Sequence, residues 1–181
     1  RQRQMCIRDS GNLVTDYDEL QASVASFAAS CANKLRGQHS LTSAVTVFVS
    51  SNRFREDLPQ YSNGQTRILP MPTSDTIEIT QAALSVLKEI YREGISYKKT
   101  GVVLGNITDA SYIQQNLFDE VKNRPERMQL MKSIDALNYR FGLRKIHLAV
   151  EGEEKQAWHA KSEFRSGNYL SDLKEILTIR I

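Results

Sequence analysis

The stretch SAVTVFVSS, residues 43–51, decides the fold, because valine occupies every second position through its centre. Successive side chains of a strand point to opposite faces, so the three valines share one face while Thr46, Phe48 and Ser50 share the other. This alternation predicts a strand with one strongly aliphatic face. Such a face needs a second layer to bury it, and the sequence on either side supplies helices.

Two helical patterns flank this strand. Thr15 or Asp16 is expected to cap the first helix, and Gly37 to stop it. Asp75 and Glu78 have the spacing of a capping box for the second helix, and Gly94 follows its end. The apolar positions at helical spacing are Leu20, Val24, Phe27, Cys31 and Leu35 in the first helix, and Ile79, Ala83, Val86, Leu87 and Ile90 in the second. We therefore assign Cys31 to core packing, not to catalysis.

Two further strands complete the pattern. Residues Thr66 to Pro70 read as a strand that Pro70 and Pro72 terminate, and Ser96 to Leu104 read as another that ends in three apolar residues. The order helix, strand, strand, helix, strand predicts a two-layer α+β sandwich. Its mixed or antiparallel sheet would be covered on one face by two helices and open on the other.

Polar side chains gather at the strand ends beside this open face. Arginine, lysine and neutral donors of this kind suit phosphate oxygens. The alternative is that they serve solubility and discourage edge pairing. The candidate DNA-binding residues are Arg53, Arg55, Tyr61, Asn63, Thr66, Arg67, Lys98 and Lys99.

Composition limits the classes of function. The chain has 181 residues, a formal net charge of +3 and two isolated cysteines, which predicts a globular protein without a disulfide framework. It contains neither an apolar run of membrane-spanning length nor a leader pattern, so we expect a cytoplasmic protein. The three histidines are scattered, and neither a phosphate loop nor a nucleophile elbow occurs, so we expect no metal site and no independent active site.

A short segment between two folded parts has the pattern of a docking peptide. Residues Gln114, Gln115, Asn116, Leu117 and Phe118 place a polar anchor before two large apolar groups, which a groove on a partner can capture. The alternative is that Leu117 and Phe118 lie beneath a loop of their own chain.

Four motifs occur in the order and spacing of a Y-family DNA polymerase little finger: Asp16–Glu19, Val45–Ser50, Pro72–Thr76 and Tyr97–Val102. From Gly11 to Ile181 the chain resembles the C-terminal part of the UmuC-type polymerases, the catalytic subunits of polymerase V. The resemblance implies that the sheet grips DNA backbone phosphates during translesion synthesis in the SOS response. It also implies that residues 114–118 bind the bacterial sliding clamp.

The resemblance sets limits as well. The Mg²⁺-binding carboxylates of the parent polymerase would lie upstream, so this chain should need no cofactor and incorporate no nucleotide. Residues 1–10 resemble translated sequencing adapter and are excluded from the predicted fold, although the family's first strand runs there. We therefore expect a non-native segment (1–10), a little finger (11–108), a linker (109–126) and a UmuC-type C-terminal module (127–181).

The C-terminal module is expected to begin with an amphipathic helix that ends at Gly142. Its apolar positions are Leu130, Ile134, Leu137 and Phe141. Residues Lys145 to Val150 and Leu177 to Ile181 read as strands. Trp158 is a candidate contact residue for a partner, which the family suggests is the UmuD' dimer, and a core role is the alternative.

These patterns predict a non-catalytic fragment of a Y-family polymerase that binds primer-template DNA without sequence preference and docks on the sliding clamp. The alternative is a stand-alone interaction module that binds the clamp and not DNA. The DNA-binding function needs Arg67, Lys98 and Lys99 on a common exposed surface.

Overall fold

The computed structural model describes residues 3–111, 123–142 and 144–152. Four strands and two helices form its main body, and a third helix and a short 3-10 turn follow. The elements in chain order are β1 (Arg3–Val14), α1 (Tyr17–Gly37), β2 (Ser40–Ser51), β3 (Ser62–Thr73), α2 (Thr76–Ile90), β4 (Tyr97–Asp109), α3 (Arg124–Phe141) and η1 (Ala149–Glu151).

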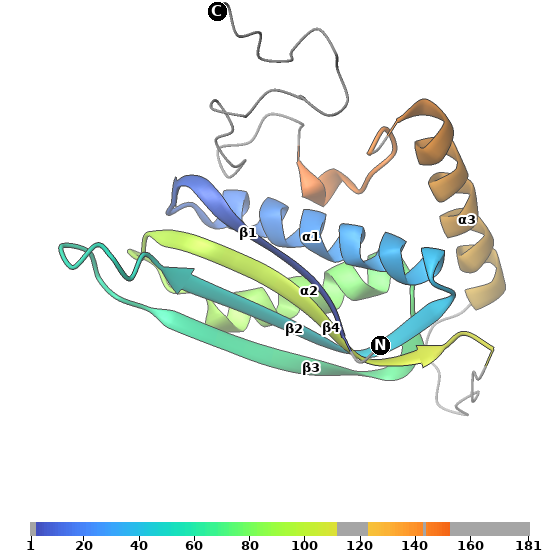
Figure 1. Cartoon of the computed structure of the whole chain (residues 1–181), viewed down its shortest axis with the longest axis horizontal. Helices are drawn as coiled ribbons and strands as arrows, with labels where there is room; N and C mark the ends of the chain where they lie inside the picture. Colours follow the sequence, from blue (N-terminus) through green and yellow to red (C-terminus); the bar gives the residue numbers. More distant parts are fainter. Residues whose placement is uncertain (1–2, 112–122, 143, 153–181) are drawn as a thin grey trace, which may run out of the picture.

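The strands form one antiparallel sheet in the order β1-β4-β2-β3. Helices α1 and α2 both lie against the same face of this sheet (Figure 1). The two-layer α+β fold predicted from the sequence is therefore confirmed.

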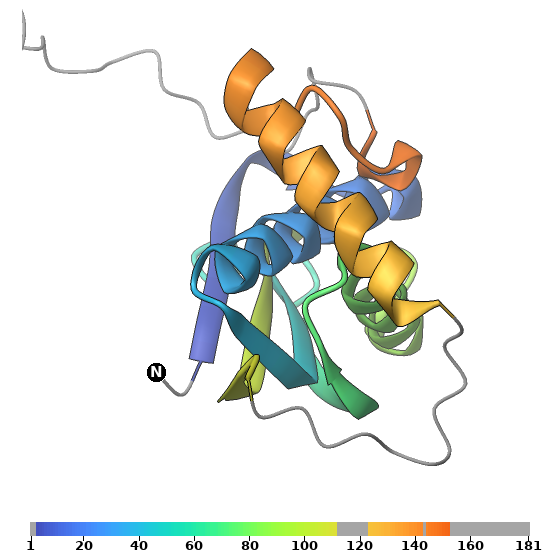
Figure 2. The ribbon, with the colours of Figure 1, turned by 90° about the vertical axis from the view of Figure 1, so that its right-hand side faces the viewer.

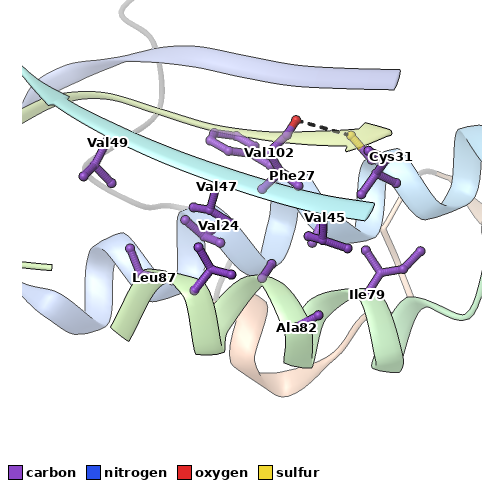
Figure 3. Close-up of a cluster of buried hydrophobic side chains, with 14 of the residues drawn as sticks. Val24, Phe27, Cys31, Val45, Val47, Val49, Ile79, Ala82, Leu87 and Val102 are labelled. Atoms are coloured by element: carbon purple, nitrogen blue, oxygen red, sulfur yellow. Dashed lines mark hydrogen bonds between the residues drawn. The ribbon is translucent and has the colours of Figure 1, made fainter. Parts of the chain in front are cut away.

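The core lies between the sheet and these two helices. Val45, Val47 and Val49 of β2 are fully buried, as their alternation predicted, and face apolar residues of both helices (Figure 3). The side chain of Cys31 is also fully buried, and its sulfur lies 4.0 Å from the carbonyl oxygen of Val102. The assignment of Cys31 to core packing is confirmed.

Carboxylates cap both core helices. The Oδ2 atom of Asp16 accepts a hydrogen bond from the Glu19 amide at 3.3 Å, and the Oδ1 atom of Asp75 accepts one from the Ile77 amide at 2.7 Å. The predicted stop at Gly37 agrees with the last residue of α1. The predicted stop at Gly94 needs correction, because α2 already ends at Ile90 and the φ of 79° at Gly94 serves the following turn.

The prediction that Pro70 and Pro72 terminate the second strand is wrong, because both prolines lie within β3 (Ser62–Thr73). Two features explain this. Strand β3 is at the edge of the sheet, where a proline costs no ladder hydrogen bond on its outer side. The register with β2 also shifts between the pairs Thr42–Thr73 and Ala44–Ile68, so the prolines lie in a bulge.

The exclusion of residues 1–10 from the predicted fold is wrong, because β1 begins at Arg3. Residues from Arg3 onward pair with β4, and Cys6 lies opposite Val102. This segment has no hydrophobic period, so no strand was predicted from its pattern. Its place at the edge beside an apolar strand is what makes it extended. Its non-native origin stays a prediction.

Helix α3 lies across the outer side of the helix layer, and η1 follows beside α1 (Figure 2). The predicted strand from Lys145 to Val150 is wrong, because this segment is irregular up to η1. The predicted apolar stripe is the docking face of α3 only in part. Ile134 is half-buried and lies beside the buried Met131, whereas Leu130, Leu137 and Phe141 are exposed.

Ion pairs hold α3 on the helix layer. Arg36 of α1 donates two hydrogen bonds to the Asp135 carboxylate, at 2.7 and 2.8 Å, and Arg127 donates one of 2.7 Å to Asp75. Arg36 also donates to the Ser74 carbonyl and to the Thr76 hydroxyl. The guanidinium therefore ties α3 to both α1 and the start of α2.

Replacing Asp135 by Ala should loosen this attachment. The side chains of Arg36 and Asp135 are only 12% and 26% exposed, so their hydrogen bonds are partly shielded from water. We expect a loss of about 1–3 kcal/mol in docking free energy. It should appear as faster amide hydrogen exchange in α3 with unchanged exchange in β2.

Glu126→Ala removes an exposed carboxylate from the same helix and is the control. Equal exchange in the two variants would contradict this role of Asp135.

Candidate nucleic-acid interface

One face of the sheet is not covered by any helix that the structure describes (Figures 1 and 2). Because residues paired across antiparallel strands share a face, the register identifies the side chains that lie there. Val45, Val47 and Val49 face the helices, so Ala44, Thr46, Phe48 and Ser50 belong to the opposite face, with their partners. We call this the open face. Its described central residues are Ala44, Thr46, Phe48, Ser50, Ser62, Gly64, Thr66, Ile68, Lys99, Gly101, Val103 and Gly105.

The open face is mostly uncharged. Three of its positions are glycines, and most others carry small side chains. Gly64 is tightly placed, because a Cβ atom there would lie 3.0 Å from the Cβ atom of Phe48. The hydroxyl oxygens of Thr46 and Thr66 are 2.7 Å apart and bridge β2 and β3. This surface can approach a broad ligand closely with its backbone.

Lys99 brings a positive charge to the open face. It pairs with Ser50 on β2, and its neighbour Lys98 is half-buried where the register shifts. Thr66, also predicted, lies on this face and is exposed. The structure therefore places Lys99 and Thr66 on one surface.

Arg67 lies on the other side of the sheet. It is the β3 partner of Val45, which faces the helices, and its guanidinium forms an ion pair with Glu89 of α2. The expectation of a common exposed surface for Arg67 and Lys99 is therefore wrong. Residue type alone could not reveal this, because the face depends on the register with β2.

Tyr61 and Asn63 also belong to the helix side. The Tyr61 hydroxyl donates a hydrogen bond of 2.7 Å to the carbonyl oxygen of Ile90 at the end of α2. The side-chain amide of Asn63 donates one of 3.0 Å to the same hydroxyl. Arg92 stacks over the Tyr61 ring at 4.8 Å. These contacts fix the end of α2 against β3, and they correct the placement of both residues beside the open face.

An aromatic cluster at this end of the molecule was not predicted. The ring centroids of Tyr17 and Tyr91 are 4.9 Å apart, and those of Tyr91 and Tyr97 are 5.8 Å apart. Tyr97 is buried, and this desolvation raises the pKa of its phenol. Its hydroxyl accepts from the Arg92 amide at 2.8 Å. Tyr17, Tyr91 and Tyr97 lie at or beside the ends of elements predicted from the sequence. This position was the one feature of the sequence that could have indicated the cluster.

The loop between β2 and β3 holds the two remaining predicted arginines. Arg53 is exposed, whereas Arg55 forms two hydrogen bonds to Asp57, at 2.6 and 2.7 Å. This interaction lowers the pKa of Asp57, so the pair stays charged and internally neutralised at neutral pH. With Glu56 also present, residues 52–61 carry two arginines and two carboxylates. The loop is therefore not strongly positive.

Residues 114–118, the predicted clamp-binding segment, lie outside the described residues, as do Trp158 and the predicted strand 177–181. Within the described ranges no group of three His, Cys, Asp or Glu side chains could hold a metal ion. No helix in those ranges is long and apolar enough to cross a membrane.

Comparison with known families identifies the class of the protein. The chain belongs to the impB/mucB/samB family, whose C-terminal domain matches residues 2–117. A domain of unknown function (DUF4113) matches residues 128–179. The UmuC-type family resemblance is therefore confirmed.

Three proteins of known families that resemble this chain are longer than it is. Protein UmuC of Salmonella typhimurium is 35% identical over 99% of this chain, and protein ImpB of the same species is 35% identical over all of it. Protein MucB of Escherichia coli is 30% identical over 97%. The chain spans 42%, 42% and 41% of these relatives' lengths.

One solved structure with a similar fold is a complex of the beta-clamp processivity factor and the little finger domain of PolIV. It has a TM-score of 0.43 and 12% identity, and the match covers 65% of this chain and 99% of that one.

Proposed function

We propose that this chain is the DNA-holding C-terminal region of an error-prone Y-family polymerase, and that the open face contacts the backbone of primer-template DNA. The uncovered sheet face carries this proposal, with Lys99 as its basic residue and without Arg67, which lies on the helix side. Its three glycines and small polar residues let a duplex approach, and Lys99 supplies a charge for a phosphate. The edge strand β3 adds outward backbone amides, which are phosphate donors in many complexes.

The catalytic step belongs to another part of the parent polymerase in this proposal. Phosphoryl transfer needs carboxylates that hold Mg²⁺, and the described residues offer no such group. In this proposal the chain holds DNA in the cytoplasm during SOS repair and does not act on it. The sliding clamp would bind residues 114–118, and the UmuD' dimer would bind the C-terminal module.

DNA binding should be weak, independent of sequence and sensitive to salt. If about three to five phosphates are contacted, log affinity should fall with log salt at a slope of roughly −3 to −5. Lys99→Ala should weaken binding to all sequences alike and reduce the magnitude of this slope by about one. Fluorescence anisotropy with a labelled primer-template, titrated at several salt concentrations, measures both quantities.

Arg67→Ala is the matched control, because it removes one positive charge from the helix side of the same sheet. It should leave the salt slope unchanged. If Arg67→Ala reduces the slope and Lys99→Ala does not, DNA does not lie on the open face. Absence of binding at low salt would favour the alternative of an interaction module that binds the clamp alone.

A further inference from the structure

A groove lies on the opposite side of the molecule from the open face, between α1, α3 and the segment that ends in η1. Its volume is about 540 Å³. Its walls include Phe27 and Ser30 of α1, Met131 and Ile134 of α3, and Ile146 and Leu148 of the following segment. The groove therefore has apolar side chains from three parts of the chain, and polar side chains such as Lys34, Arg144 and His147 also line it.

The groove is large enough for aromatic side chains. An apolar cavity of about 150 Å³ already holds a benzene ring. Met131, in the wall, is the one described residue of α3 that is buried, whereas Ile146 is 41% exposed. Among the described residues, the apolar side chains of the groove thus leave a space of about 540 Å³ between them.

The course of the chain indicates which segment could fill the groove. Glu151 lines it, and the described chain ends one residue later at Gly152. Six further residues lead to Trp158, a length that can span up to about 20 Å. Trp158 is thus the first large aromatic residue after the groove, and it lies within reach.

The family comparison links the two parts independently. The match to the domain of unknown function begins at residue 128, within α3, and ends at residue 179, so α3 and the tail belong to one domain. A domain buries its apolar residues in a common core. The residues of the tail that could contribute are Trp158, Phe164, Tyr169, Leu170, Leu177 and Ile179.

We propose that residues 153–181 of the same chain dock in this groove, with Trp158 between α1 and α3. This contact completes the C-terminal domain and fixes it on the helix layer, on the face opposite the proposed DNA surface. A partner that binds this domain would then meet a surface formed jointly by α1, α3 and the tail. The proposal does not depend on DNA binding.

Trp158 is the only tryptophan of the chain, so its fluorescence reports the contact directly. In the full-length chain its emission should be blue-shifted relative to the urea-unfolded protein and protected from acrylamide. Ser30→Glu and Ile134→Glu each place a carboxylate in one wall, and both should shift the emission to that of the unfolded chain. Ser30→Glu tests the α1 wall without changing α3.

Tyr139→Glu is the control, since this side chain of α3 is 93% exposed and lies outside the groove. It should leave emission and quenching unchanged. Far-ultraviolet circular dichroism should show the same helix content in all variants. Emission equal to that of the unfolded chain in the unaltered protein would overturn the proposal, as would insensitivity to both groove variants. A blue shift that disappears on dilution would assign the groove to a second copy instead.

Discussion

Replacing Leu87 by Ala is expected to lower the free energy of unfolding by about 2–5 kcal/mol. Leu87 is fully buried on α2, in the cluster that packs against Val47 and Val49 of the sheet (Figure 3). The change removes apolar contacts and leaves a cavity between two rigid layers, which can collapse only in part. Urea unfolding followed by circular dichroism should show a lower midpoint with an unchanged slope.

Ile68→Ala is the matched control for this prediction. Ile68 has a side chain of similar size but is 63% exposed on the open face. Its removal should change the free energy of unfolding by less than about 0.5 kcal/mol. Equal losses in the two variants would mean that another layer covers the open face, and the proposed DNA surface would then be buried.

The core could be predicted because its pattern is local. The alternation in β2 identified the buried valines, and the 3.6-residue period identified the buried faces of α1 and α2, including Leu35 and Ile90. Carboxylates at Asp16 and Asp75 marked the helix starts. Each of these signals depends on a few adjacent residues, so no knowledge of strand pairing was needed.

The site was harder to predict because it depends on register. Lys99 and Arg67 were equivalent as basic residues near strand ends, yet one lies on the open face and the other faces α2. A shift of one residue moves a side chain to the opposite face, so the face depends on how β3 pairs with β2. This pairing does not follow from composition or spacing.

Helix α3 shows a second limit of the periodic pattern. The stripe that includes Leu130 and Leu137 predicted the buried face, but α3 docks through Met131 and through ion pairs such as that of Asp135 with Arg36. The period shows that a helix has an apolar face, and it does not show which neighbour covers that face. Charged pairs with sequence separations of 99 residues could not be anticipated.

Replacing both Leu117 and Phe118 by Ala is expected to abolish binding to the bacterial sliding clamp. In the proposed function these side chains fill an apolar pocket on the clamp. The burial of each contributes roughly 1.5–3 kcal/mol, so the double change should cost about 3–6 kcal/mol. A loss of this size eliminates a micromolar interaction. Calorimetry with purified clamp should detect it, and Gln114→Ala should weaken binding less, since it removes only an orienting hydrogen bond.

The same double variant separates the docking peptide from the alternative, in which Leu117 and Phe118 lie beneath a loop of their own chain. A docking peptide contributes little to folding, so the melting temperature should remain that of the unaltered protein. Residues buried in the chain's own core would instead leave a cavity, and a loss of about 3–6 kcal/mol would lower the melting temperature by many degrees. Both quantities should therefore be measured on one preparation. Reduced stability with unchanged clamp binding would place Leu117 and Phe118 in a core and remove the clamp from the proposed function.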